Sequence, residues 1–435
     1  MPKPRVVAFV PAKGSSSRIE NKNTRLLDGK PLFLHTLEKL MACPFIDEVI
    51  LDSECDAIHE MAAEIPCTKM RRDPALASNA TDGNSLFMNE VRFTEADIYI
   101  QVLCTSPFIR IETIRQAVDR LLNSDTYDSA VLVRKDKLYL WNDDRPVYDI
   151  DHIPNSNTLP DTTIETMGLY VMRREAALGT GRRIGMRPFL IEASPLDALD
   201  VNFPEDLPIA ELIAAGKREH ERRLFANIRG YLTSPLLSDT LDELGYRNQV
   251  IKGLSPNMGD AKIFGRAKTL KIRRMREGED YRGIYDALQS YKTIVPNDVI
   301  MVENEVPDYA YFGELNANLA LRCGAVGVVV GGMTRDTFDV RRLGLPVFAR
   351  GSTCQDVKGR AVTESINRTI HVEGVEVRPN SMVFGDGDGI VVIPPQVEQA
   401  VLERTNAVIG TEKKILADVA LGVSVDRIIS EHGFF

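Results

Sequence analysis

The sequence predicts an α/β protein with a doubly wound sheet in its N-terminal half and a second α/β domain after it. Through the first half, short apolar runs alternate with amphipathic helical patterns, which is the rhythm of β-α-β units. Beyond residue 216 the chain becomes rich in valine and glycine, and its β-branched runs end at glycines. The length of 435 residues also favours two or three domains.

The elements of the first half follow one another in regular order. Aliphatic runs predict the strands, and apolar residues at helical spacing predict the helices. The predicted strands are 5–12, 46–53, 96–104 and 127–135, and the predicted helices are 31–43 and 111–124. Ligands of doubly wound sheets bind beyond the carboxyl ends of strands. We therefore expect a site in the loops that follow the first and third strands.

The second half is punctuated by glycine and proline. The runs 325–336, 343–351 and 381–395 each hold a β-branched stretch and a tight turn, so much sheet is expected there. A dense charge run precedes them and is typical of a solvated helix or a linker. The expected organisation is a first domain over 1–216, a charged linker over 217–223 and a second domain over 224–435.

The composition restricts the partners. The net charge of −9 argues against a general binder of nucleic acid or membrane surfaces, because both need a basic face. No apolar run approaches the ~20 residues of a membrane helix. The six cysteines form no CxxC pair, so free thiols are expected. These features together predict a cytoplasmic protein.

The loop after the first strand reads "PAKGSSSRIENKN". Gly14 permits unusual backbone angles, and the small serines after it let successive N–H groups converge on an anion. Lys13, Arg18 and Lys22 can neutralise a polyphosphate. The spacing is not that of a P-loop. From these residues alone, a nucleotide site and a plain polar turn remain equally good interpretations.

Six segments in order resemble the sugar nucleotidyltransferases, most closely the cytidylyltransferases that make CMP-sialic acid. That family opens with A-R-G-G-S-K-G-x-x-x-K-N, which corresponds here to "AKGSSSRIENKN". The matching segments are 12–23, 27–40, 71–82, 103–110, 165–172 and 199–212. The resemblance implies a Rossmann-like nucleotidyltransferase domain with CTP as substrate and Mg²⁺ as cofactor.

The resemblance also implies roles for individual residues. Lys22 would be catalytic and stabilise the α-phosphate, with Lys13 and Arg18 on the β- and γ-phosphates. Asp200 and Asn202 would bind the metal. The implied nucleotide-binding residues are Ala12, Lys13, Gly14, Ser15, Ser16, Arg18, Asn23 and Arg72, the last two holding the nucleoside. The anomeric hydroxyl of a 2-keto sugar acid would attack the α-phosphate, and pyrophosphate would leave.

The sequence departs from this family at several positions. Ser17 and Arg18 stand where the family has Lys and Gly, and Lys13 replaces an arginine. Asn202 replaces one aspartate of the metal pair, so it brings an oxygen but no charge; Asp206 could assist. The family's glutamine before "TSP" either is replaced by Leu103 here or is displaced to Gln101. The acceptor therefore need not be sialic acid.

A second group of motifs surrounds Arg335 and Asp336. Alone, this dipeptide at a strand exit is best interpreted as a surface ion pair. With its neighbours it resembles the family of 4-hydroxy-4-methyl-2-oxoglutarate aldolase and the regulator of ribonuclease E activity. The matching segments are 237–256, 313–317, 332–336, 343–351 and 385–394, and the resemblance covers 224 to about 405.

This second resemblance implies a Mg²⁺-dependent pyruvate aldolase or lyase acting on 4-hydroxy-2-keto acids. Asp336 would bind the metal. Arg335 would stabilise the pyruvate enolate, and Glu314 would be catalytic in proton transfer. The implied substrate-binding residues are Gly313, Leu315, Asn316 and Arg335, with backbone N–H groups on the pyruvate carboxylate. Family members form trimers or hexamers, so a homo-oligomer is expected.

Both resemblances point to 2-keto acids. We therefore expect a bifunctional enzyme that activates a 3-deoxy-2-ulosonic acid to a CMP-sugar and also cleaves or forms a keto acid. The small-molecule partners would be CTP, the sugar acid and pyruvate. An alternative is a cytidylyltransferase for another acceptor, such as a phosphonate, with a non-catalytic C-terminal module for binding or oligomerisation.

Overall fold

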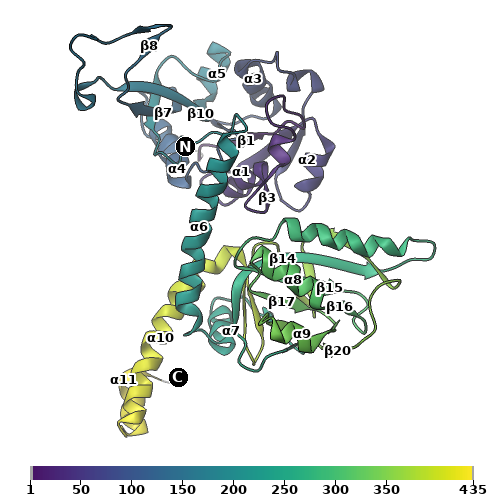
Figure 1. The fold of residues 1–435 in the computed structure, drawn as a ribbon. Coiled ribbons are helices and arrows are strands. Elements are labelled where there is room, and N and C mark those ends of the chain that lie inside the picture. Colours follow the sequence, from purple (N-terminus) through teal and green to yellow (C-terminus); the bar gives the residue numbers. More distant parts are fainter. Residues whose placement is uncertain (1–2, 434–435) are drawn as a thin grey trace. The chain divides into compact units, whose positions relative to one another are not determined.

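A computed structural model describes residues 3–433, and the chain divides into two compact units, Met1–Ala214 and Ala215–Phe435. The division falls inside one long helix, α6 (Asp206–Arg229), which is drawn as one unbroken helix in Figure 1. The segment 217–223, expected as a linker, is therefore part of a continuous helix.

The first unit is built on a seven-stranded sheet of order β11-β7-β10-β6-β1-β4-β5. Its strands are β1 (Val6–Pro11), β4 (Glu48–Ser53), β5 (Thr68–Arg71), β6 (Ile98–Val102), β7 (Ser129–Asp136), β10 (Thr162–Arg173) and β11 (Pro188–Glu192). β10 runs antiparallel to β6 and β7, and the other neighbours are parallel. The predicted α/β class and the four predicted strands are confirmed.

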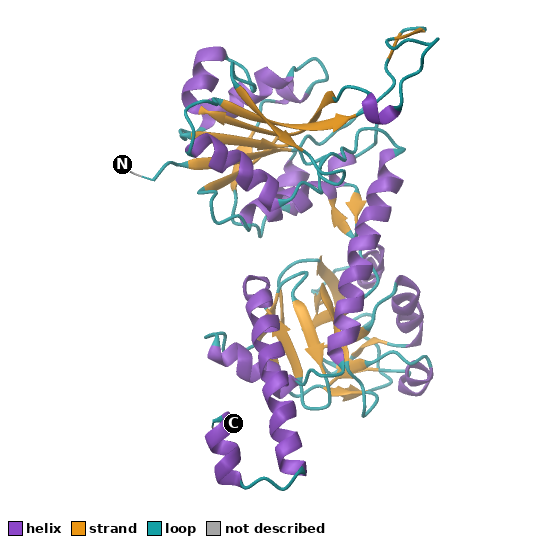
Figure 2. Ribbon diagram, turned by 90° about the vertical axis from the view of Figure 1, so that its left-hand side faces the viewer, coloured by secondary structure: helices purple, strands orange, loops and turns teal. Residues whose placement is uncertain are grey.

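Helices cover both faces of this sheet (Figure 2). They are α1 (Leu32–Met41), α2 (Asp56–Met61), α3 (Gly83–Phe93), α4 (Ile111–Leu122) and α5 (Arg174–Thr180), with short helices η1 (Lys22–Thr24), η2 (Pro74–Ala77) and η3 (Ser156–Thr158). Two small hairpins complete the unit, β2 (Leu26–Leu27) with β3 (Lys30–Pro31), and β8 (Trp141–Asn142) with β9 (Arg145–Pro146). The β8–β9 hairpin projects from the rest of the unit (Figure 1).

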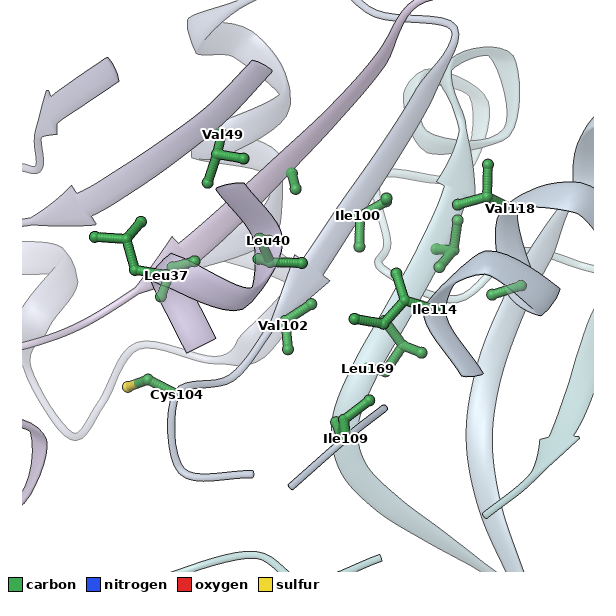
Figure 3. Packing of buried hydrophobic residues seen from close by; sticks show 14 of the residues in the cluster. Leu37, Leu40, Val49, Ile100, Val102, Cys104, Ile109, Ile114, Val118 and Leu169 are labelled. Atoms are coloured by element: carbon green, nitrogen blue, oxygen red, sulfur yellow. The ribbon is translucent and has the colours of Figure 1, made fainter. Parts of the chain in front are cut away.

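The first core lies on the two faces of the central strand β1. Val6, Ala8 and Val10 pack with α1 and α4, whereas Val7 and Phe9 pack with α3 and α5. Side chains alternate across a strand, so an uninterrupted apolar run is expected only where both faces are covered. Figure 3 shows the first of these faces, with Leu37, Leu40, Val49, Ile100, Val102, Cys104, Ile109, Ile114, Val118 and Leu169 labelled.

The second unit is built on a nine-stranded mixed sheet of order β12-β25-β24-β14-β15-β17-β19-β13, with β21 on β14. β14, β15, β17 and β19 are parallel to one another. The strands of this sheet are β12 (Val250–Ile251), β13 (Ser255–Pro256), β14 (Ile263–Arg274), β15 (Asp298–Asn304), β17 (Gly327–Val330), β19 (Val347–Ala349), β21 (Ala361–Ile366), β24 (Met382–Gly385) and β25 (Ile390–Ile393).

A small parallel sheet, β16-β18-β20, lies in the same unit and carries the loops of interest. Its strands are β16 (Ala310–Phe312), β18 (Met333–Thr334) and β20 (Gly351–Ser352); β22 (Ile370–Val372) pairs with β23 (Val375–Val377). The helices are α7 (Ser234–Glu243), α8 (Glu314–Cys323), α9 (Thr337–Arg342), α10 (Glu398–Ala420), α11 (Val425–His432), η4 (Tyr281–Lys292) and η5 (Pro395–Val397).

The end of α6 is anchored in the second unit. The ring of Phe225 stacks on Phe264, with 4.1 Å between their centroids. Arg266 is held by Glu221 at 2.6 Å and by Glu398 at 2.5 Å. Glu221 lies within the predicted linker, and its ion pair with Arg266 ties this segment to the second unit.

Candidate functional sites

The first candidate site lies at the carboxyl end of β1, where the loop of residues 12–21 leaves the sheet. Asn23 is buried at its end and donates from Nδ2 to the Lys13 carbonyl at 2.8 Å. The Cys104 thiol donates to Asn23 Oδ1 at 3.3 Å. Both polar atoms of the Asn23 side chain are therefore bonded within the protein. In this structure Asn23 fixes the shape of the loop.

Lys22 reaches from the loop to the segment after β11. Its Nζ donates to the Val201 carbonyl at 3.1 Å and to Asn202 Oδ1 at 3.4 Å. Burial lowers the pKa of Lys22, and the neighbouring Asp200 carboxylate opposes this shift. A half-buried ammonium group beside a single carboxylate is suited to bind an incoming anion.

Asp200 and Asn202, the predicted metal ligands, contact each other. Asn202 donates from Nδ2 to Asp200 Oδ2, and the Ser106 hydroxyl donates to Asp200 Oδ1 at 3.3 Å. Asp206 accepts the N–H groups of Asn202 and Phe203 at 2.8 and 2.7 Å, so it fixes the turn before α6. Mg²⁺ commonly takes one or two carboxylates and completes its shell with substrate phosphates and water. Asp200 fits that use.

The cationic side chains of the loop lie at its rim. Lys13 donates from Nζ to Asn79 Oδ1 at 2.9 Å. The Arg18 guanidinium lies over the ring of Phe203, 5.2 Å from its centroid. Ser15 is exposed, whereas Ala12 is buried at the end of the strand. The predicted phosphate-binding residues are thus gathered around one edge of the sheet.

Arg72, predicted to hold the nucleoside, is buried in an ion-pair network. It pairs with Asp52 at 3.2 Å and with Glu54 at 2.8 Å, and its side chain is 3% exposed. Glu54 also accepts the N–H of Gly14 in the loop at 2.7 Å. Neither acid was expected in the site. The only signal in the sequence that could have indicated them was their place at the end of a predicted strand, with Asp52 in its last two residues and Glu54 directly after it.

The second candidate site is a cavity of about 1040 Å³ in the second unit. Gly313 directly follows β16, and α8 begins at the next residue. The Glu314 N–H donates to Asp336 Oδ2 at 3.2 Å. All the residues predicted for the aldolase-like site line this cavity, namely Gly313, Glu314, Leu315, Asn316, Arg335 and Asp336.

Arg335 is oriented by two carboxylates. Its Nη1 lies 2.8 Å from Asp356 Oδ2, and its Nε lies 3.7 Å from Asp336 Oδ2. Asp356 was not predicted, and no motif in the sequence marks it. Asp336 adopts a left-handed backbone conformation, with φ of 53°, which is uncommon for a residue with a side chain and recurs at functional sites.

Two hydrogen bonds of Asn316 hold the start of α8 in place. Asn316 donates from Nδ2 to the Tyr311 carbonyl at 3.2 Å, and its own carbonyl accepts the Tyr291 hydroxyl at 3.3 Å. Leu315, by contrast, is 81% exposed. The cations Arg322 and Lys358 also line the cavity. The cavity thus combines fixed backbone N–H groups, three cations and three carboxylates.

Metal binding at either site would need ligands from the substrate and from water in addition to those of the protein. Within residues 3–433, three His, Cys, Asp or Glu side chains converge within 4.8 Å only at Asp418, Glu431 and His432. Asp200 and Asp336 lie outside that group. Each would therefore hold a divalent cation together with substrate oxygens and water, which is ordinary for Mg²⁺.

Comparison with known proteins assigns a family to each unit. Residues 7–159 match the cytidylyltransferase family model, and residues 234–392 match the aldolase/RraA model. The class defined by fold and site is thus a nucleotidyltransferase domain fused to an aldolase-like domain. The chain belongs to the aldolase/RraA family through its second unit, and its first unit is a cytidylyltransferase domain resembling those of CMP-sugar acid synthases.

Three curated relatives illustrate this. Protein DlpA of Legionella pneumophila is 30% identical over 195 residues, which are 44% of this chain and 31% of that protein. A putative 4-hydroxy-4-methyl-2-oxoglutarate aldolase of Halalkalibacterium halodurans is 31% identical over 39% of this chain and 75% of its own length. The CMP-N,N'-diacetyllegionaminic acid synthase of L. pneumophila is 31% identical over 26% of this chain and 52% of its own.

The chain therefore spans about a third of the first relative and about half of the third. In the described part of the chain, no helix is both long and apolar enough to cross a bilayer.

Proposed function

We propose that the first unit transfers CMP from CTP to the anomeric hydroxyl of a 3-deoxy-2-ulosonic acid. The hydroxyl oxygen bonds to the α-phosphorus, the bond from that phosphorus to the β-phosphate oxygen breaks, and pyrophosphate leaves. The observation that carries the proposal is Lys22, half-buried at the carboxyl edge of the sheet beside Asp200. The similarity to a CMP-N,N'-diacetyllegionaminic acid synthase supports an acidic sugar as acceptor.

Catalysis would depend on positioning and charge neutralisation. Lys22 would neutralise the α-phosphate, and Lys13 and Arg18 at the loop rim would hold the β- and γ-phosphates. Asp200 would hold Mg²⁺, with the Asn202 oxygen beside it. The ion would supply further charge neutralisation of the phosphates. Ala12, Ser15 and Ser16 stay predicted contacts of the nucleotide through the loop backbone.

For the second unit, the proposed reaction is cleavage of a 4-hydroxy-2-keto acid to pyruvate and a carbonyl product, or the reverse. The N–H groups of Leu315 and Asn316 at the start of α8 would bind the keto acid's carboxylate. Arg335, held by Asp356 at 2.8 Å, would stabilise the enolate oxygen. Glu314 would move the proton, and Asp336 would hold Mg²⁺ as a Lewis acid.

The joint function would be two activities on 2-keto acids in one homo-oligomeric chain, as trimers or hexamers through the second unit. The second candidate is a cytidylyltransferase for another acceptor, such as a phosphonate, with a non-catalytic second unit. Asn202 in place of an acid keeps that acceptor possible. Arg335 lies in the cavity between two carboxylates, and this arrangement favours a catalytic second unit.

The test is a screen of the full chain for pyrophosphate release from each nucleoside triphosphate with a panel of 2-ulosonic acids and phosphonates. We expect release with CTP and a sugar acid, and loss of at least about a hundredfold in Lys22→Met. Release of pyruvate from 4-hydroxy-2-keto acids is measured in parallel. Equal pyruvate release by the native chain and Asp336→Ala would exclude the proposed lyase.

A further inference from the structure

Glu54 joins the phosphate loop to a buried charge network. It follows β4, and its carboxylate is shared between two donors, the Gly14 N–H at 2.7 Å on Oε1 and the Arg72 Nη2 at 2.8 Å on Oε2. The side chain is 14% exposed. Burial alone would raise the pKa of Glu54, but the bonds from Arg72 and the Gly14 amide outweigh it and lower the pKa. Glu54 is therefore a bridging anion.

A second contact fixes the loop at the same place. A β-carbon added to Gly14 would lie 2.7 Å from Cβ and 2.8 Å from Sγ of Cys55, the residue after Glu54. Real side chains do not approach so closely, so the loop backbone is seated directly on segment 54–55. The orientation of the loop's first amide is thus set by one hydrogen bond and one close backbone approach.

The inner end of the network is buried throughout. Arg72 pairs with Asp52, which is fully buried next to the equally buried Glu90. Gln101 donates to Glu90 Oε2 at 2.6 Å. Asp52 Oδ1 and Glu90 Oε1 have no other hydrogen-bond partner. A proton on Glu90, donated to Asp52, would satisfy both oxygens.

Burial and the Asp52 charge raise the pKa of Glu90 well above its usual range, which agrees with a protonated Glu90. The network then holds two carboxylates, Asp52 and Glu54, around one guanidinium. Because a buried charge without its partner is costly, Arg72 is committed to these two acids. Binding of a nucleoside would therefore not break the ion pairs of Arg72.

From this geometry we infer that Glu54 and Arg72 are positioning residues, which hold the Gly14 end of the loop so that its following amides face the β- and γ-phosphates of CTP. The inference rests on the proposed cytidylyltransferase function. Since the network contacts the loop backbone at Gly14, it should act on the triphosphate part of the ligand. Replacement of Glu54 would then weaken the binding of CTP and hardly change the binding of CMP.

The test compares binding of CTP and CMP by calorimetry to the full chain, to Glu54→Gln and to Asp56→Asn. In Glu54→Gln the amide NH2 would face a donor at one of the two contacts, Arg72 or the Gly14 N–H, whichever way it turns, so the bridge is lost with little change in shape. Asp56→Asn is the matched control, since it removes an equal charge two residues later from an exposed pair with Arg71. We expect CTP to bind about tenfold more weakly to Glu54→Gln.

CMP affinity should stay within about twofold, and Asp56→Asn should match the native chain for both ligands. Unchanged CTP affinity in Glu54→Gln would overturn the inference, as would an equal loss for CTP and CMP, which a general structural defect produces. Tighter CTP binding would also overturn it, because Glu54 would then compete with phosphate for the Gly14 amide. A native chain that binds no CTP would overturn the proposed function itself.

Discussion

Gly313 and Asp336 approach so closely that a β-carbon on Gly313 would lie 2.5 Å from the carboxylate oxygen Oδ2 of Asp336. The Cγ of Arg335 would be 3.1 Å from the same β-carbon. The backbone of Gly313 is extended, with φ of −151°, so other residues could adopt it. The glycine is needed for space, because the two side chains of the second site occupy the position of its missing side chain.

Gly313→Ala should therefore damage the site more than the fold. The added methyl group would push the Asp336 carboxylate and Arg335 aside, and we expect at least about a tenfold loss of pyruvate release. Thermal stability should change little, because both displaced side chains are partly exposed. Gly259→Ala is the control, since nothing lies within 4 Å of its added carbon. Full activity in Gly313→Ala would contradict this account.

Asp356→Asn should uncouple Arg335 from its orientation. Without the charged partner at 2.8 Å, the guanidinium has only the longer contact to Asp336. We expect kcat for pyruvate release to fall about tenfold or more. The matched control is Glu376→Gln, which breaks an exposed pair with Arg378 of the same 2.8 Å length. Equal kcat values for the two variants would argue against an orienting role of Asp356.

Leu37→Ala should destabilise the first unit by about 2–5 kcal/mol, because Leu37 is fully buried between α1 and the sheet (Figure 3). Leu212→Ala, on the exposed side of α6 with 74% of the residue accessible, should change stability by less than about 0.5 kcal/mol. Urea unfolding of the full chain measures both values. A similar loss in the two variants would mean that the core is not where the structure has it.

His35 should make stability depend on pH. Burial, followed by the positive charge of Lys30, lowers the pKa of His35 to about 4 from an ordinary value of 6.5. Between pH 6.5 and 4 the unfolded chain therefore binds a proton at His35 that the folded chain does not bind. The stability that the neutral His35 contributes to the fold is full above pH 6.5 and is lost as pH falls toward 4. Urea midpoints of the native chain should fall across that window.

His35→Gln is the comparison for that series. Glutamine can still donate to the Leu27 carbonyl, which His35 Nε2 contacts at 2.8 Å, but it does not titrate. The difference between the two chains should shrink as pH falls from 6.5 to 4. Parallel curves over this range would show that other groups cause the pH dependence.

The order of elements was predictable because periodicity is local. The runs around Val6–Pro11 and Ile98–Val102 are apolar on both faces, and only a covered parallel sheet explains that. The motifs likewise predicted one site that contains Glu314, Arg335 and Asp336, and all three residues line one cavity. The ion pairs of Arg72 were not predictable from its motif, since its partners Asp52 and Glu54 lie about twenty residues earlier and meet it only across neighbouring strands. Asp356 could not be predicted from the sequence for the same reason.

Helix α6 has a practical consequence for dividing the gene. Its first turns place Leu207, Ala210 and Ala214 in one hydrophobic cluster, and Phe225 near its end belongs to another. A cut at residue 216 would expose new helix ends, with about four unpaired carbonyls on one fragment and about four unpaired N–H groups on the other. Fragments meant for separate expression should therefore overlap, each carrying the whole of residues 206–229.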